Sequence, residues 1–142
     1  MGTIIVGVDG SEPAGRALEW CARNATALGA SVVVVHAVDL PIAGAPGIGY
    51  APLPPLTEED RAELTALVRN EWSAALARAG VPFEVTVIDG PAATALRDCA
   101  RDRNAELVVV GRRGRGGFAE LLLGSTSHHL SHHLDRPLVI VP

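Results

Sequence analysis

Residues 111–127, GRRGRGGFAELLLGSTS, combine the residue types best suited to bind an anion. The stretch holds five glycines and three arginines, and it directly follows the apolar run LVVV at 107–110. Glycine lets a backbone approach a ligand closely, and the arginine guanidinium pairs with phosphate or carboxylate oxygens. Gly124, Ser125 and Thr126 begin an expected helix, whose free N–H groups and positive dipole end favour phosphate. The stretch therefore predicts a phosphate site.

Two further loops carry polar residues where apolar runs end. Asp9 follows the run at 3–8, and the run at 31–38 contains His36 and precedes Asp39. In an open parallel sheet, the first and fourth strands can be neighbours whose following helices lie on opposite faces, and ligands bind in the crevice between them. Asp9 and Gly111 are therefore expected to face each other across this crevice. We expect His36 to be structural rather than catalytic.

The apolar runs and the segments between them predict the elements that position these loops. Most of the five short runs rich in β-branched residues lack polar alternation, which is typical of strands buried on both faces. The five runs cover residues 3–8, 31–38, 83–88, 106–110 and 138–141, and helical patterns cover 14–28, 57–79, 91–104 and 124–134. This alternation predicts an α/β fold with a single doubly wound, open parallel five-stranded sheet and helices on both faces. The 142 residues are expected to form one domain, 1–142.

Residues 40–56 interrupt the alternation of strand and helix. The segment is too rich in proline and glycine for a helix, and it is longer than most loops of α/β proteins. It follows the second expected strand at its carboxyl end, where open α/β sheets bind ligands. It is expected to be either a lid over the site or an insertion without a role.

Composition narrows the class of protein. The net charge of −4 disfavours a general nucleic-acid-binding protein, and no apolar run reaches the length of a membrane span. All twelve basic residues are arginines, which excludes a lysine Schiff base and the lysine-dependent P-loop. Cys21 and Cys99 lie in separate helical segments and are expected to be buried free thiols in a reducing compartment. We therefore expect a cytoplasmic protein with no nucleic-acid or membrane partner.

The glycine spacing resembles the nucleotide motif of the ATP-binding universal stress proteins. The motif G-x2-G-x9-G-[ST] is met by Gly111, Gly114, Gly124 and Ser125. The segments VGVDGSEPAGRAL, VVHAVD and PLVIVP extend the resemblance over the whole chain. The resemblance implies a Rossmann-like fold of the adenine nucleotide alpha hydrolase-like type, and ATP, with or without Mg²⁺, as the ligand. It also implies a homodimer joined through the strand at 137–142.

The same resemblance implies roles for individual residues. Asp9 and the backbone near Ala37 are expected to hold the adenosine end of ATP, and Gly111 and Gly114 to lie against the ribose and phosphates. The residues expected to bind the nucleotide are Val8, Asp9, Ala37, Val38, Gly111, Gly114, Gly124, Ser125 and Thr126.

Binding, rather than catalysis, is the function that these residues favour. Hydrolysis of ATP needs a positioned water, an orienting residue and usually a metal ion. Asp9 is the only obvious acid near the expected phosphates, and the nucleophile motif G-x-S-x-G does not occur. We expect a nucleotide-responsive regulatory module in stress adaptation and assign no catalytic residue. A nucleotide-free dimeric interaction protein and a slow ATP hydrolase are the alternatives.

We assign no function to two other patterns in the sequence. Residues 114–119 fit the dinucleotide fingerprint G-x-G-x-x-[GA], but they follow the fourth expected strand instead of the first. Four histidines, His128, His129, His132 and His133, form two i, i+4 pairs of the kind that bind zinc or nickel. Asp135 is the only acid near them in the sequence, so no metal is assigned.

Overall fold

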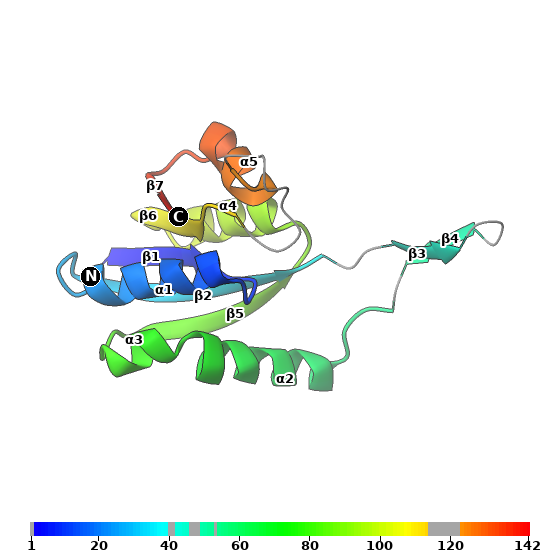
Figure 1. Cartoon of the computed structure of the whole chain (residues 1–142), viewed down its shortest axis with the longest axis horizontal. Coiled ribbons are helices and arrows are strands. Elements are labelled where there is room, and N and C mark those ends of the chain that lie inside the picture. Colours follow the sequence, from blue (N-terminus) through cyan, green and yellow to red (C-terminus); the bar gives the residue numbers. More distant parts are fainter. Residues whose placement is uncertain (1, 40–41, 46–48, 53, 114–122) are drawn as a thin grey trace.

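Five parallel strands form the central sheet of the computed structural model, which describes residues 2–39, 42–45, 49–52, 54–113 and 123–142. The strand order is β5-β2-β1-β6-β7 (Figure 1). The strands are β1 (Gly2–Gly7), β2 (Ala30–Val38), β5 (Phe83–Asp89), β6 (Leu107–Gly111) and β7 (Leu138–Val141). The predicted five-stranded parallel sheet is confirmed, and each strand lies where an apolar run predicted it.

Helices cover both faces of this sheet. On one face, α1 (Glu12–Asn24) and α3 (Ala74–Arg78) pack Leu18 and Leu76 into a core cluster with Ile4 of β1. On the other face, α4 (Ala92–Asp102) and α5 (Ser125–His133) pack Leu96 and Leu130 into a second cluster with Ile5. Adjacent residues of β1 thus enter opposite cores, because side chains alternate along a strand. The doubly wound arrangement is confirmed. Among the described residues, no helix is long and apolar enough to cross a membrane.

Capping residues begin α1 and the next helix along the chain. The Ser11 hydroxyl accepts a hydrogen bond from the Ala14 N–H at 3.3 Å, at the start of α1. At the start of α2 (Glu58–Leu67), Thr57 and Asp60 form a capping box, each side chain accepting from the other's backbone N–H at 3.1 Å. Each cap satisfies N–H groups that have no partner inside the helix.

The single helix predicted over 57–79 is interrupted in the structure. After α2 the chain makes a π-helical turn, η1 (Val68–Trp72), and then the short α3. No residue of α2 is buried, whereas Val68 and Leu76 are fully buried against the sheet. A π turn inserts one extra residue into the helical repeat. Val68 within the turn and Leu76 after it enter the same core cluster.

The proline- and glycine-rich segment contains a β-hairpin, which the sequence did not predict. Strand β3 (Ile42–Ala45) pairs antiparallel with β4 (Gly49–Pro52), and Gly49 adopts a positive φ of 88°. Figure 1 shows the hairpin projecting away from the sheet and its helices. Pro52 is the only proline in the two strands, and it lies at a strand end, where proline is tolerated.

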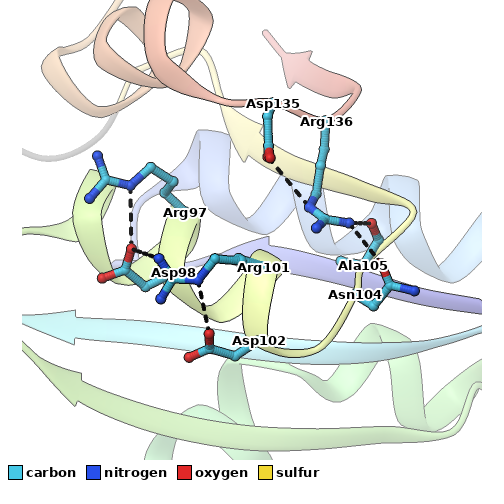
Figure 2. Close-up of polar contacts among 8 residues, drawn as sticks. All are labelled: Arg97, Asp98, Arg101, Asp102, Asn104, Ala105, Asp135 and Arg136. Carbon is cyan, nitrogen blue, oxygen red and sulfur yellow. Dashed lines mark hydrogen bonds and ion pairs between the residues drawn. The ribbon is translucent and has the colours of Figure 1, made fainter.

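Polar contacts fasten the turns at the amino edge of the sheet. Arg136, which precedes β7, donates to the Ala105 carbonyl oxygen at 2.8 Å and to the Asn104 side chain at 3.3 Å (Figure 2). Asp135 points toward the same guanidinium, with 3.5 Å between its carboxylate and Nε. Asp135 therefore lies at the edge of the sheet opposite Gly111. An acid there could not bind the ribose of a dinucleotide held after β6.

Candidate functional site

The topological switch point predicted in the sheet is present. Strands β1 and β6 are neighbours, with Ile4 opposite Leu107 and Val6 opposite Val109. The helices that follow them, α1 and α5, lie on opposite faces of the sheet (Figure 1). The carboxyl ends of both strands therefore meet at one edge, which brings the Asp9 loop and Gly111 to the same place.

Local hydrogen bonds fix the loop that follows β1. Val8 is buried, and its N–H donates to the Val35 carbonyl oxygen at 2.9 Å. A carboxylate oxygen of Asp9 accepts from the Ser11 N–H at 3.0 Å, and the intervening Gly10 has a positive φ of 79°. This turn holds Asp9 half-buried at the tip of the strand while Ser11 caps α1.

His36 links the ends of β1 and β2. Its Nδ1 atom lies 2.8 Å from the Val8 carbonyl oxygen, and its ring meets that of Trp72 edge-on, with 5.2 Å between ring centroids. Trp72 comes from the π turn and packs against the core on the same face as α1. These contacts agree with the structural role expected of His36. The histidine thus contacts the backbone of Val8, the residue that immediately precedes Asp9.

The absence of a side chain at Gly111 is explained by packing against α1. A Cβ atom at this position would lie 2.7 Å from the carbonyl carbon and Cβ of Pro13, and 3.0 Å from the Ala14 nitrogen. Such distances are shorter than van der Waals contact. Gly111 therefore lets the end of β6 approach the first turn of α1, a role that the sequence did not reveal. Gly114, the next glycine of the motif, lies outside the described residues.

The end of β2 contributes Ala37 and Val38. Both residues are half-buried, and they pair with Ile88 and Asp89 of β5. The Val38 carbonyl oxygen accepts from the Gly90 N–H at 2.8 Å. The structure thus brings Ala37 and Val38 to the same carboxyl edge as Asp9, because β2 lies directly beside β1.

Hydrogen bonds to Arg112 join the end of β6 to the start of α5. The Arg112 carbonyl oxygen accepts from the Gly124 N–H and from the Ser127 hydroxyl, each at 2.7 Å. The Ser127 side chain is buried and also lies 3.2 Å from the Gly124 carbonyl oxygen. The Gly124 N–H is therefore used within the protein instead of facing a ligand. Sequence reasoning missed Ser127, whose only signal was a small hydroxyl residue one turn after the glycine.

The first turn of α5 supplies the hydrogen-bond donors of the site. Gly124 is the N-cap, and the first helical bond runs from the His128 N–H to the Gly124 carbonyl oxygen at 2.9 Å. The N–H groups of Ser125 and Thr126 precede that bond, so the helix itself offers them no acceptor. Ser125 is exposed and Thr126 half-exposed, so both can reach a ligand.

Two arginine side chains lie at the same edge. The Nε atoms of Arg112 and Arg113 are buried and have no hydrogen-bond partner among the described residues. A buried guanidinium nitrogen is costly unless it meets an acceptor. The Ser125 and Thr126 N–H groups, at the start of α5, are donors suited to an anion.

Comparison with known proteins agrees with this architecture. The sequence profile of the universal stress protein family matches residues 1–142. This chain belongs to the universal stress protein family. A universal stress protein of Thermus aquaticus is 34% identical over 148 residues, which cover 98% of this chain and 97% of that protein. One from Mycolicibacterium smegmatis is 30% identical over 140 residues, covering 97% of this chain but only 47% of its own length.

Solved structures of the family share the fold. A universal stress protein crystallised in complex with cAMP is 27% identical to this chain, with a TM-score of 0.72, and the alignment covers 99% of this chain and 95% of that one. A family member from Burkholderia pseudomallei is 26% identical, with a TM-score of 0.71 and coverage of 99% and 96%. The Archaeoglobus fulgidus protein in complex with dAMP, at 22% identity and a TM-score of 0.71 over 100% of this chain and 98% of its own, supports the fold alone.

Proposed function

We propose that this universal stress protein binds an adenine nucleotide, with ATP as the ligand, at the carboxyl edge of the sheet. The observation that carries the proposal is the meeting of three features at the switch point. These are the Asp9 carboxylate, the end of β2, and the donor-rich start of α5. Open α/β sheets bind ligands at such crevices. The related protein at 27% identity, crystallised with cAMP, supports an adenine nucleotide as the class of ligand.

The charges of the site match the two ends of a nucleotide. Asp9 accepts hydrogen bonds and is suited to the hydroxyl groups of ribose, with Val8, Ala37 and Val38 forming the adjoining wall. The Ser125 and Thr126 N–H groups, at the positive end of the α5 dipole, are suited to phosphate oxygens.

The remaining proposed residues act through the shape of the site. Gly111 draws β6 against α1, and Gly124 ends the loop that begins at Arg112. Gly114 retains the role implied by the family motif. The Arg112 and Arg113 guanidinium groups add positive charge near the phosphates.

Binding is favoured over hydrolysis. Among the proposed site residues Asp9 is the only acid, and one of its oxygens already accepts from the Ser11 N–H. A single carboxylate held in this way can bind ribose or a hydrated Mg²⁺, but no second group is assigned to orient an attacking water. We therefore propose a cytoplasmic, nucleotide-responsive regulatory module of the stress response. Phosphate release with saturating ATP and magnesium at the rate of a protein-free control is the expected result, and turnover above it would favour a slow ATP hydrolase.

A matched pair of variants tests the position of the site. Asp9→Ala is expected to weaken ATP binding by about tenfold or more, because it removes a charged acceptor from the site. Asp39→Ala removes an exposed acid just after β2 and is expected to bind as the wild type does. Equilibrium binding of ATP is measured for both, with thermal unfolding confirming that each variant is folded. Equal affinities for the two variants would place the nucleotide elsewhere.

We also propose a homodimer formed through β7. This strand is an edge of the sheet, and edge strands present unpaired backbone groups that can pair with another chain. The Pro137 and Val141 carbonyl oxygens accept from the N–H groups of Val108 in β6 and of Arg112 just after it, so the alternating backbone groups of Leu138 and Ile140 face away from β6.

Light scattering distinguishes the proposed dimer from a monomer. The wild type is expected at about twice the chain mass of 14.8 kDa. Ile140→Pro removes an outward N–H and is expected to give monomer, whereas Ile140→Val keeps that N–H and should remain dimeric. A monomeric wild type would refute the dimer. A dimer that binds no nucleotide would favour the interaction protein.

A further inference from the structure

Helix α5 carries four histidines on its exposed surface. Leu130 and Ser127 are its buried residues, and His128, His129, His132 and His133 are all exposed. None of these imidazoles enters the core or the proposed nucleotide site, which uses the first turn of the same helix. Their exposure leaves them accessible to a ligand from solution.

The helix brings the histidines together as two pairs. The ring centroids of His128 and His132 are 4.8 Å apart, and those of His129 and His133 are 4.4 Å apart. Residues four apart lie one above the other on a helix. The sequence neighbours His132 and His133 are farther apart, at 6.5 Å, with rings inclined by 61°.

We propose that α5 binds divalent transition-metal ions, one chelated by each i, i+4 histidine pair. Imidazole nitrogen suits Cu²⁺, Ni²⁺ and Zn²⁺, whereas Mg²⁺ requires oxygen ligands. Affinity should decrease from Cu²⁺ to Ni²⁺ and Zn²⁺, because two nitrogen ligands impose little geometric selection.

The protein supplies two ligands to each ion. Within the parts of the chain that the structure describes, no group of three or more His, Cys, Asp or Glu side chains is arranged to hold a metal. The nearby Asp135 carboxylate is directed toward the Arg136 guanidinium (Figure 2). Solvent or another molecule therefore completes the coordination, and the bound ion is exchangeable. This distinguishes the pairs from a closed structural site with four protein ligands.

Metal binding should stabilise the folded chain. The paired geometry exists only while residues 128–133 are helical, so an ion that binds both imidazoles favours the native state. The effect requires no nucleotide, so its test is independent of the proposed ATP site.

Two double variants with the same number of histidines provide the test. His128→Ala with His132→Ala removes one pair and keeps the pair of His129 and His133. His128→Ala with His129→Ala also removes two histidines, but it leaves only neighbours that do not face each other on the helix. The measurement is calorimetric titration of tag-free, nucleotide-free protein with NiCl₂, with MgCl₂ as the control ion.

The wild type is expected to bind two Ni²⁺ per chain and the first double variant one. The second double variant is expected to lose affinity by about tenfold or more, because each imidazole then binds alone. Thermal unfolding with and without NiCl₂ gives a second readout. The metal-induced rise in Tm should persist in the first variant and disappear in the second. Equal binding by the two double variants, or no binding by the wild type, would overturn the proposal.

Discussion

The Nδ1 atom of His36 donates a hydrogen bond to the carbonyl oxygen of Val8, at a distance of 2.8 Å. A carbonyl oxygen can only accept, so Nδ1 must carry the proton. The last paired residues of β1 and β2 are Gly7 and Val35. His36 therefore extends the connection between the two strands by one residue. It fixes the peptide that immediately precedes Asp9.

Substitutions at His36 should alter nucleotide affinity according to where they place a donor. His36→Leu removes the donor, frees the Val8 carbonyl and should weaken ATP binding by about 3- to 10-fold, the usual effect of losing one hydrogen bond. His36→Asn places an amide nitrogen near the position of Nδ1 and should restore binding to within about twofold of the wild type. His36→Gln, whose amide lies farther out, should not. Titration calorimetry of the three variants provides the measurement, and wild-type affinity in His36→Leu would show that this bond does not position Asp9.

A methyl group at Gly111 should destabilise the fold. In Gly111→Ala the new Cβ would lie 2.7 Å from two atoms of Pro13, so β6 and α1 must separate. Overpacking of this kind costs about 1–3 kcal/mol. The control is Gly15→Ala, where nothing lies within 4 Å of the added Cβ and alanine favours the helix by up to about 1 kcal/mol. Urea unfolding should show effects of opposite sign, and an unchanged free energy of unfolding in Gly111→Ala would contradict the packing role.

Ser127 should matter more than its neighbour on the exposed side of α5. Ser127→Ala removes a buried hydroxyl bonded to the Arg112 carbonyl oxygen and should cost about 1 kcal/mol of stability. The same substitution should weaken ATP binding, since the bond joins β6 to the start of α5. Ser131→Ala removes an exposed hydroxyl and should change stability by less than about 0.5 kcal/mol. Equal effects of the two substitutions on the urea midpoint would argue against a special role for Ser127.

The two cysteines should differ in their reaction with thiol reagents. Burial raises the pKa of Cys21 to about 12, and it also raises the pKa of Cys99 above the ordinary value of 9.0. Cys99 lines a surface cavity of about 310 Å³ beside Thr94 and Arg103, whereas Cys21 is fully buried. Because the thiolate is the reactive form, both should react slowly at neutral pH and faster as the pH rises. Mass spectrometry of alkylated protein should show Cys99 modified first and Cys21 only on unfolding. Faster labelling of Cys21 would contradict its burial.

The sequence was sufficient to predict the sheet, because each of its three central strands, β1, β2 and β6, contains an uninterrupted run of β-branched residues. The run at 32–35, VVVV, is buried throughout. The interruption of the helix predicted at 57–79 could not be predicted from the sequence. The π turn at Val68–Trp72 depends on how that segment meets the sheet, and a helical repeat alone does not reveal this.

The roles of individual site residues were harder to predict than their location. The prediction that Asp9 and Gly111 lie at the same edge of the sheet depends only on strand order, and β1 and β6 are indeed neighbours. The reason for glycine at 111 depends on Pro13, which is distant in sequence and reaches it only through the fold. Likewise, the Gly124 N–H was expected to hold phosphate but donates to Arg112, a bond that depends on where the loop closes.

The most direct test of the nucleotide site is calorimetric titration of nucleotide-stripped wild-type protein with ATP in the presence of magnesium. The proposed site is one per chain, at the edge where β1 and β2 end and α5 begins. We predict saturable binding of one ATP per chain, which Asp9→Ala weakens and Asp39→Ala leaves unchanged. No binding at millimolar ATP would contradict the proposed function, and a dimeric interaction protein would then be the better account.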